Sequence, residues 1–460
     1  MRATVEHERK LDAPAGFELP ELGGEPLEPR LFTSVYFDTP GRSLAAAGIT
    51  LRRRTEHGRA LWQLKLPADD ARLELELEGG PAGAPAEFVD LLHAHLRHGS
   101  LEKVAELRTR RRGELVARDG AAAEVTVDEV AVMDAQQVRD TFVEVEVELR
   151  AGRPDYLDVL VDELSGAGAE PASGVPKLFR ALGREPEKGR SGITPLEKLC
   201  VRLREQLREV ERHDPGTRLG QDPESLHDMR VGVRRLRALL RAGRPLVLDD
   251  TSELEDRLRE LGVVLGEVRD LDVLLERLDA EGAELGEPDA AQARSLLTAL
   301  SRERTEKRRR LLDVLRSGAY LALLDDTAST IDVLRPGSDE LSLADLAAKA
   351  AKRLRKAVDA LPREPSDDEL HAVRKKGKRA RYAAELAGQK NVVRRAKKFQ
   401  DVLGEHQDAA VAVERLRELA ADASAAQALA AGRLVEREEA RRSAARAAWP
   451  RTWEKLRKAL

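Results

Sequence analysis

The chain has 460 residues, of which 35% are charged and 3% aromatic, and its formal net charge at pH 7 is −4. A chain of this length is too long to form a single ordinary hydrophobic core, so we expect two or three domains. A single cysteine, Cys200, excludes an internal disulfide framework and is typical of a reducing compartment. No stretch approaches the ~20 apolar residues of a transmembrane helix. We therefore expect a cytoplasmic protein that does not enter a membrane.

The overall charge hides two modules of opposite sign. Residues 1–187 carry 24 basic and 35 acidic residues, a net charge of −11. Residues 188–460 carry 55 basic and 48 acidic residues, a net charge of +7. The sequence therefore predicts an acidic N-terminal module joined to a basic C-terminal one.

Residues 1–185 alternate between apolar and charged side chains in short runs. These runs are VEHERKL, SVYFDT, ITLRRRT, LWQLKL, RLELELEG, EVTVDEVAV and FVEVEVEL. Period-two alternation is typical of β-strands, and Gly, Pro and Asp separate the runs. Seven or eight such strands could close into a barrel with a polar lumen and an apolar outer face covered by helices.

Carboxylates and guanidinium groups in one lumen would suit the hydrolysis of phosphate anhydrides. Carboxylate oxygens are ligands for Mg²⁺ or Mn²⁺, and Arg and Lys bind phosphate oxygens and neutralise charge in the transition state. The alternative is that the charged positions are the solvated outer face of an ordinary sheet.

Residues 186–194 form a linker rich in glycine and charge, and residues 195–460 have the composition of long helices. Sequence echoes divide this part into two repeats, about 195–330 and 340–460. Each repeat can supply about four helices, which predicts duplicated four-helix bundles.

One motif occurs in both repeats, 144 residues apart: LHDMRVGVRRLRAL around His227 and LHAVRKKGKRARYA around His371. Basic residues follow each histidine three, seven, eight and ten positions later, so the histidine and the first two cations share a helix face. Like charges at this spacing destabilise an isolated helix, and their repetition indicates a bound polyanion. The alternative is a pair of solvated helix faces. A second echo pairs LGEVRDLDVLLERL from Leu265 with LGEHQDAAVAVERL from Leu403.

The N-terminal module resembles the CYTH, or triphosphate tunnel metalloenzyme, family. The residues Glu6–Lys10 match its E-x-E-x-K signature. YFDTP, LRRR, LK, RLELELE, VTVD and EVEVEL follow in the family's order, and Lys177 resembles the basic residue of its closing motif. The resemblance implies an eight-stranded antiparallel tunnel barrel, and hence an α+β multidomain chain.

The same resemblance implies a catalytic site and a cofactor, Mg²⁺ or Mn²⁺. Residues expected in the catalytic site are Glu6, Glu8, Lys10, Arg52, Arg54, Lys65, Glu76, Arg108, Arg110 and Lys177. Arg111 and Arg112 stay open as alternatives to Arg108 and Arg110, because this run of arginines has no clean alternation. The expected metal ligands are Glu6, Glu8, Glu146 and Glu148.

The C-terminal module resembles the CHAD family, a conserved-histidine α-helical domain that binds inorganic polyphosphate. The resemblance rests on the two histidine motifs and the two LGE motifs. The expected polyphosphate-binding residues are His227, Arg230, Arg234, Arg235, Arg237, His371, Arg374, Lys378, Arg379, Arg381, Arg394, Lys397 and Lys398. We expect Asp270 and Asp408 to order neighbouring arginines. No nucleic acid is expected, because few aromatic side chains are present to stack on bases.

The sequence thus predicts an inorganic triphosphatase that also binds long-chain polyphosphate and associates with polyphosphate granules. Three alternatives stay open. The tunnel could be catalytically idle in a polyphosphate-binding protein, it could be a CYTH-type adenylate cyclase, or the helical module could be an RNA-binding scaffold.

Overall fold

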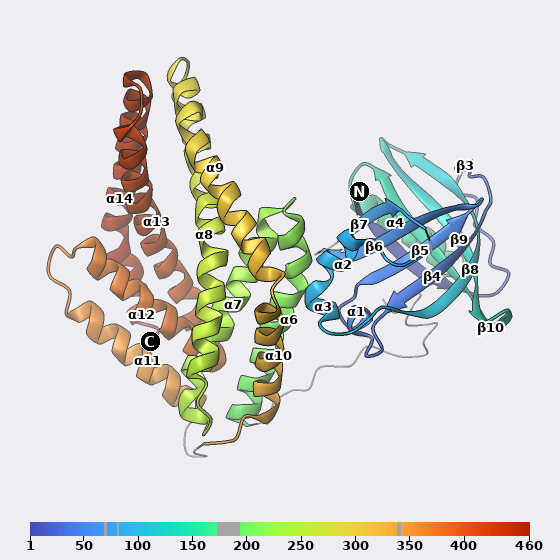
Figure 1. Cartoon of the computed structure of the whole chain (residues 1–460), viewed down its shortest axis with the longest axis horizontal. Coiled ribbons are helices and arrows are strands. Elements are labelled where there is room, and N and C mark those ends of the chain that lie inside the picture. The colour runs from blue at the N-terminus through green and yellow to red at the C-terminus, as the bar shows by residue number, and fades with distance from the viewer. Residues whose placement is uncertain (69–70, 81, 173–193, 338–341) are drawn as a thin grey trace. The chain divides into compact units, whose positions relative to one another are not determined.

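The computed structural model describes residues 1–68, 71–80, 82–172, 194–337 and 342–460. The chain divides into two compact units, Met1–Gly189 and Arg190–Leu460 (Figure 1). The strands of the first unit are β1 (Arg2–Glu6), β2 (Glu8–Ala13), β3 (Glu25–Pro26), β4 (Arg30–Asp38), β5 (Thr50–Glu56), β6 (Arg59–Ala68), β7 (Ala71–Glu78), β8 (Glu102–Arg118), β9 (Ala121–Asp134), β10 (Gln137–Ala151) and β11 (Glu170–Pro171). Its helices are α1 (Ser43–Ala46), α2 (Ala86–Leu91), α3 (His93–Leu96) and α4 (Asp155–Gly166).

The second unit is helical. Its α-helices are α6 (Pro195–Leu219), α7 (Pro223–Gly243), α8 (Ser252–Ala283), α9 (Asp289–Leu315), α10 (Gly318–Val333), α11 (Leu343–Asp359), α12 (Asp367–Leu386), α13 (Lys390–Ala421) and α14 (Ala425–Arg457). Among the described residues, no helix combines the length and hydropathy needed to cross a membrane.

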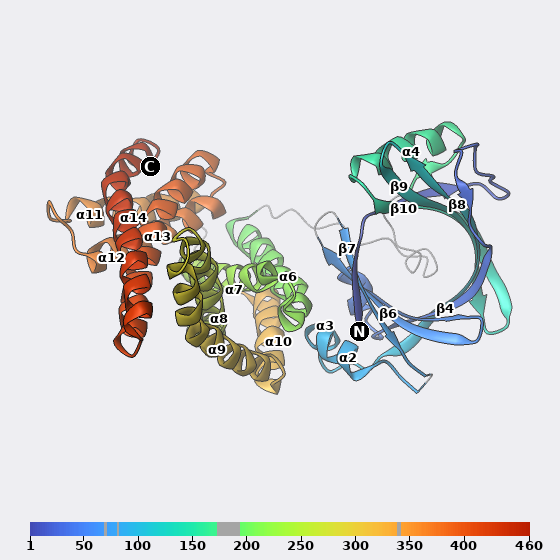
Figure 2. The ribbon, with the colours of Figure 1, turned by 90° about the horizontal axis from the view of Figure 1, so that it is seen from above.

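The strands of the first unit close into a barrel, which Figure 2 shows as a ring. Strand β1 pairs with β7 and strand β2 pairs with β10, and only His7 separates β1 from β2. The N-terminal segment therefore joins the two edges of the sheet. With β1 and β2 counted as one strand, eight antiparallel strands of the described residues form the ring, in the order β1/β2, β7, β6, β5, β4, β8, β9 and β10. The predicted antiparallel barrel is confirmed.

The alternation in the sequence determines which side chains enter the lumen. Along β10, Val145 and Val147 point outward and pack in a buried cluster with Leu157 and Leu160 of α4. Glu146 lies between these two valines and points inward, so it faces the lumen. Helix α4 therefore stabilises the barrel from outside and leaves the charged face free to line a cavity.

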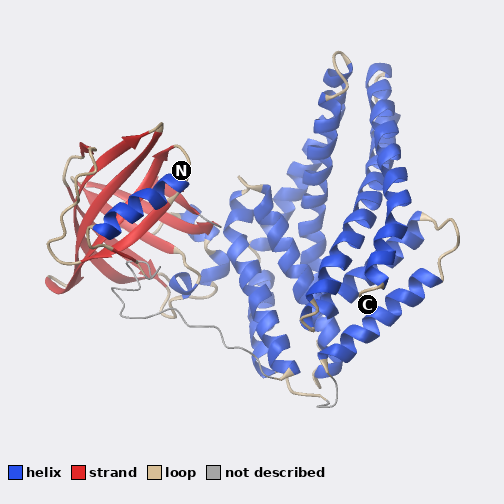
Figure 3. Ribbon diagram, turned by 180° about the vertical axis from the view of Figure 1, so that it is seen from behind, coloured by secondary structure: helices blue, strands red, loops and turns tan. Residues whose placement is uncertain are grey.

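The helical unit contains two versions of one arrangement (Figure 3). The histidine motifs lie on α7 and α12, and the LGE motifs lie on α8 and α13. In the first repeat, α9 ends at Leu315 and α10 begins at Gly318. Ser317 caps α10 by accepting a hydrogen bond from the Tyr320 N–H. The second repeat has one 33-residue helix, α14, in the corresponding place.

The two repeats share a hydrophobic core. Leu274 of α8 and Leu297 of α9 belong to one buried cluster with Leu416 of α13 and Leu434 of α14. Helices α7 and α12 also contact each other. Helices α8 and α9 of the first repeat thus pack with α13 and α14 of the second in one core. The contact between α7 and α12 brings the two histidine motifs together.

Candidate active site and anion-binding surface

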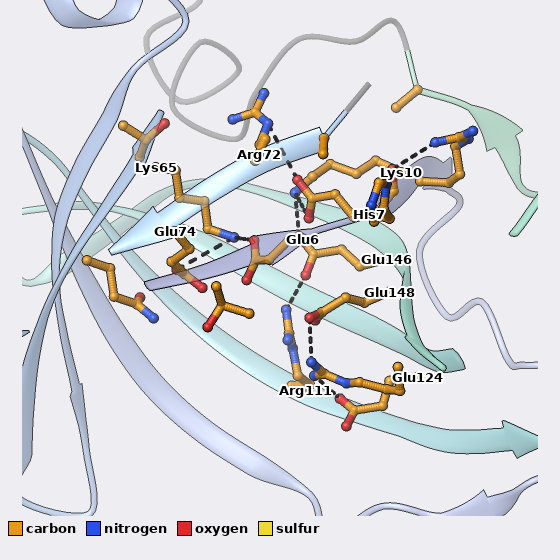
Figure 4. Close-up of a pocket in the computed structure, with 18 of the residues that line it drawn as sticks. Glu6, His7, Lys10, Lys65, Arg72, Glu74, Arg111, Glu124, Glu146 and Glu148 are labelled. Atoms are coloured by element: carbon orange, nitrogen blue, oxygen red, sulfur yellow. Dashed lines mark hydrogen bonds and ion pairs between the residues drawn. The ribbon is translucent and has the colours of Figure 1, made fainter. Parts of the chain in front are cut away.

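The barrel encloses a cavity of 1190 Å³ lined mainly by charged side chains. Figure 4 shows that acidic and basic groups from different strands point into the same space. This arrangement follows from the closed barrel, because every second residue of each strand faces the lumen.

The segment β1/β2, which joins the sheet edges, supplies charged groups to the cavity, among them Glu6, Glu8 and Lys10. Glu6 precedes the break at His7, and Glu8 and Lys10 follow it. The Lys65 ammonium lies 2.5 Å from the Glu6 carboxylate, and the Lys10 ammonium lies 2.5 Å from that of Glu146. Lys65 also lies 3.6 Å from Glu74, so each ammonium group contacts more than one carboxylate along this wall.

Several of these groups have shifted pKa values. Burial raises the pKa of Glu148 to about 7, with Arg150 opposing and Glu6 adding to the rise. Burial and a hydrogen bond with Glu74 raise the pKa of Glu6. Burial opposes the charge on Lys10, but Glu146 and other carboxylates hold its pKa well above the ordinary value. Glu6 and Glu148 are therefore carboxylates whose charge is incompletely compensated.

Cations cluster around Arg54 in the same cavity. Burial and the charges of Arg52 and Arg111 lower the pKa of Arg54 to about 9. The Arg52 Nε donates a 2.8 Å hydrogen bond to Gln63, and Arg111 forms a bidentate pair with Asp128 at 2.6 and 2.7 Å. Mutual repulsion among these guanidinium groups would be relieved by a bound anion.

A metal ion is compatible with the donor set, although it would have to replace existing ion pairs. As placed, no group of three or more His, Cys, Asp or Glu side chains in the described ranges is arranged to hold a metal. The ammonium groups of Lys10 and Lys65 lie among the carboxylates instead. Carboxylate oxygens from β1, β2 and β10 nevertheless face one lumen and are the ligands preferred by hard divalent cations.

Most of the residues expected in the catalytic site face this cavity. Glu76, on β7, accepts a 2.8 Å hydrogen bond from the Gln63 amide. The expected residues that line the cavity are Glu6, Glu8, Lys10, Arg52, Arg54, Lys65, Glu76, Glu146 and Glu148.

The structure places Arg108 and Arg110 elsewhere, which corrects their assignment to the tunnel. Both lie on the outer face of β8 beside Glu129, whereas Arg111 enters the lumen. The run of arginines in β8 gives no clear alternation, so the sequence alone does not reveal which of them point inward. The pairing of Arg111 with Asp128 on the neighbouring strand would have shown that Arg111 points inward. Lys177 lies outside the described residues.

Of the charged residues that line the cavity but were not assigned from the sequence, four lie on β7, β9 and β10. Arg72 and Glu74 lie on β7, Glu124 lies on β9 and Arg150 lies on β10. Arg150 bridges Glu124 at 2.8 Å and Glu148 at 2.5 Å. Arg72, Glu74 and Arg150 lie an even number of residues from an assigned residue of the same strand, so they face the same side of the sheet. Glu124 lies directly opposite Glu148 on the neighbouring strand. These positions are the signal that could have identified all four.

In the helical unit, the two histidine motifs meet where α7 and α12 contact each other. The Arg234 Nε donates a 3.2 Å hydrogen bond to the Tyr382 hydroxyl across this contact. Lys378 lies within electrostatic range of Arg230, Arg234 and Arg374. We call these four cations, Arg230, Arg234, Arg374 and Lys378, the central cluster.

Glycines of the LGE motifs make room for the central cluster. A Cβ on Gly266 would lie 3.3 Å from the Arg230 Nε, and one on Gly404 would lie 3.4 Å from an Arg374 Nη. Arg230 also pairs with Asp270 at 3.0 Å, which is consistent with an ordering role for that carboxylate. The two repeats thus hold an arginine in the same way.

The charge of the central cluster is poorly compensated. Burial, followed by Arg374, Arg234 and Arg230, lowers the pKa of Lys378 to about 7. The Arg374 Nε is buried without a hydrogen-bond partner in the described residues. Burial also lowers the pKa of both motif histidines, His227 and His371.

The remaining expected cations lie on α7, α12 and the start of α13. Arg235 lies 3.9 Å from Glu385. Arg379 is in electrostatic range of Arg237 and Arg241. Arg381 lies over the Tyr382 ring at 5.0 Å. The cations at the start of α13 are exposed; they are Arg394, Lys397 and Lys398.

Comparisons with known proteins agree with this division of the chain. Residues 4–179 match the family described as the CYTH domain, and residues 201–417 match the CHAD domain. An uncharacterized protein of Mycobacterium tuberculosis, Rv2226, is 32% identical over 463 residues, which cover 92% of this chain and 90% of the relative.

Two solved structures are similar to part of the chain. PptA from Streptomyces chartreusis is 26% identical with a TM-score of 0.50, and the match covers 56% of this chain and 99% of PptA. The CHAD domain from the plant Ricinus communis is 25% identical with a TM-score of 0.48, and the match covers 60% of this chain and 97% of that domain.

Proposed function

Because the chain belongs to the family of proteins in which a CYTH domain is followed by a CHAD domain, we propose that its barrel is a metal-dependent triphosphatase and that its helical unit binds inorganic polyphosphate. The proposed substrate of the barrel is inorganic triphosphate or short polyphosphate. The observation that carries the proposal is one cavity that holds both a guanidinium group with a lowered pKa, Arg54, and carboxylates with a raised pKa, Glu6 and Glu148.

Within this proposal, the carboxylates and cations of the barrel have different tasks. Glu6, Glu8, Glu146 and Glu148 would hold one or two Mg²⁺ or Mn²⁺ ions, which would supply Lewis-acid neutralisation of the phosphate oxygens. When a metal ion binds these carboxylates, Lys10 and Lys65 would lose their ion pairs with Glu146 and Glu6 and could bind phosphate instead.

Arginine side chains would hold the other part of the substrate. Arg52, Arg54 and Arg111 carry forked donors that match phosphate oxygens, and they would stabilise the charge that builds up on the leaving group. Arg111 replaces Arg108 and Arg110 in this role because it enters the cavity.

The lining of the cavity favours an inorganic chain over a nucleotide. Tyr36 is the one aromatic side chain among the described residues that line it, and its hydroxyl contacts Arg52 at 3.4 Å. A nucleobase would therefore find few apolar or aromatic surfaces, whereas phosphate groups find cations on several strands. This argues against the adenylate cyclase alternative.

The central cluster and its surrounding arginines support polyphosphate binding by the helical unit. Its cations come from both repeats, so a bound chain would contact the two repeats together. Base recognition needs stacking platforms, and Tyr382, the aromatic residue at the α7–α12 contact, already engages Arg234. An inorganic polyanion therefore suits this surface better than RNA.

One assay separates the alternatives. The full chain is incubated with inorganic triphosphate, ATP or long polyphosphate, with Mg²⁺ and with Mn²⁺, and the products are identified. Phosphate release from triphosphate supports the proposal, and cyclic AMP from ATP would establish the cyclase. A chain that binds polyphosphate by calorimetry but produces neither product would have an idle tunnel.

A further inference from the structure

Among the half-buried arginines that line the cavity in the described residues, Arg54 differs from the others in having no acidic partner. Its side chain forms no ion pair within the described ranges, and its Nε is buried without a hydrogen-bond partner. The nearby Glu56 is occupied by Arg30, which holds it with two hydrogen bonds of 2.6 Å. A buried guanidinium group without a carboxylate is costly unless something else stabilises it.

An aromatic ring takes the place of that carboxylate. The Arg54 Cζ lies 3.5 Å from the ring centroid of Phe32, and the Arg111 Cζ lies 5.6 Å from it. Phe32 is a buried residue of β4 on the same strand face as Tyr36, which lines the cavity. Its direct cross-strand partners are Glu56 of β5 and Thr109 of β8. Arg54 and Arg111 lie two residues from these partners, and both guanidinium groups lie over the ring.

The chemical difference between a ring and a carboxylate matters for anion binding. A carboxylate would neutralise Arg54 and accept two of its N–H groups. The π-face attracts the cation without accepting a conventional hydrogen bond, so the charge and the donors stay available to a ligand. The ring face covered by Arg54 is also unavailable for stacking on a nucleobase.

We propose that Phe32 is a positioning residue that holds Arg54 un-neutralised as the subsite for one end of an inorganic triphosphate. This inference rests on the proposed function of the barrel. It adds the residue that keeps Arg54 available to bind a terminal phosphate group of the substrate. Phe32 acts through Arg54 and touches no reacting atom.

The test is a double-mutant cycle on triphosphate binding. Calorimetry measures the Kd of inorganic triphosphate for the full chain, for Phe32→Leu, for Arg54→Gln and for the double variant, and steady-state assays give kcat and KM. Removing the ring should weaken binding about 5- to 30-fold, the range expected for a desolvated cation–π contact. KM should rise by a similar factor with little change in kcat. In the Arg54→Gln background the same replacement should cost nothing further.

Two controls separate positioning from packing. Phe32→Tyr keeps the ring and should restore binding. Phe88→Leu removes a fully buried ring of α2 outside the cavity; it should lower Tm without changing Kd. The inference is overturned if Phe32→Leu binds triphosphate as tightly as wild type, or if it costs the same in the presence and absence of Arg54.

The binding measurement also separates this inference from the proposed activity. Triphosphate binding without hydrolysis would refute the triphosphatase and still allow the cycle to be completed on Kd. A wild-type chain that does not bind triphosphate would overturn both.

Discussion

The ammonium group of Lys10 lies 2.5 Å from the carboxylate of Glu146, directly opposite it across the β2–β10 pair that closes the barrel. The same ammonium is 3.4 Å from Glu144 and 3.5 Å from Glu8. Arg111 also pairs with Glu146, and Arg72 lies 3.6 Å from Glu8, so these carboxylates share several cations. A divalent cation bound here would take over part of this charge compensation.

Replacing Glu6 and Glu8 together by Gln should abolish metal-dependent triphosphate hydrolysis. The side chains keep their size, but two hard ligands are lost from a site with few protein contacts. Phosphate release with Mg²⁺ and with Mn²⁺ measures the loss, and circular dichroism checks the fold. Glu129→Gln, at a half-buried carboxylate on the outer face of β9, is the matched control and should stay active. Hydrolysis at the wild-type rate in the double variant would refute the metal assignment.

The parity of β8 gives a second prediction. Arg111→Gln should raise KM for triphosphate at least 10-fold, because a forked phosphate donor is lost from the lumen. It should also lower Tm, since the ion pair between Arg111 and the fully buried Asp128 is lost. Arg110→Gln changes an outer residue whose side chain is 70% exposed, and it should leave both KM and Tm near wild type. The opposite pattern would return Arg110 to the tunnel.

The sequence predicted the barrel and most of its lining because strict alternation assigns each side chain to a face. That logic works for Glu146 and Lys10, whose neighbours alternate cleanly, and fails in β8, where consecutive arginines occupy both faces. Phe32 was invisible for a different reason: an apolar residue on a strand indicates packing, and only the three-dimensional contact with Arg54 reveals another role. The shared core of the helical repeats also depends on contacts between residues such as Leu274 and Leu434, which are distant in the sequence.

Each unit should function alone. Residues 1–189 should retain triphosphatase activity, and residues 190–460 should bind long polyphosphate without hydrolysing it, because each unit has its own buried core. Thermal melting followed by circular dichroism tests whether the pieces fold, and activity and calorimetry test each function. Cooperative unfolding of both pieces with loss of both functions would show that the activities need the intact chain.

Polyphosphate binding should weaken as pH rises through about 7. The pKa of Lys378 in the free protein is about 7, and a bound polyanion favours its charged form, so binding takes up a proton above that pH. Affinity should be constant with respect to this group below pH 7 and fall by about 3- to 10-fold toward pH 9 as one charge contact is lost. The Lys378→Arg variant keeps the charge and should lose this part of the pH dependence, whereas titration of the ligand's terminal phosphates is unchanged. Identical pH profiles for the two proteins would exclude Lys378 as the titrating group.

The last prediction concerns whether the two repeats act on one polyphosphate chain. If they do, reversing Arg230 and Arg234 to Glu should reduce affinity by far more than half, because each repeat holds the chain at high effective concentration for the other. Reversing Arg374 and Lys378 should have a similar effect, since these residues meet the first pair in the central cluster. Wild-type affinity should also fall steeply with salt, as counterions released from the polyanion oppose binding. The matched control reverses Arg302 and Arg309, two exposed arginines of α9 that give the same change in net charge. Calorimetry at two salt concentrations checks all four proteins. Equal, salt-insensitive affinities throughout would show that the two histidine motifs do not form a joint binding site.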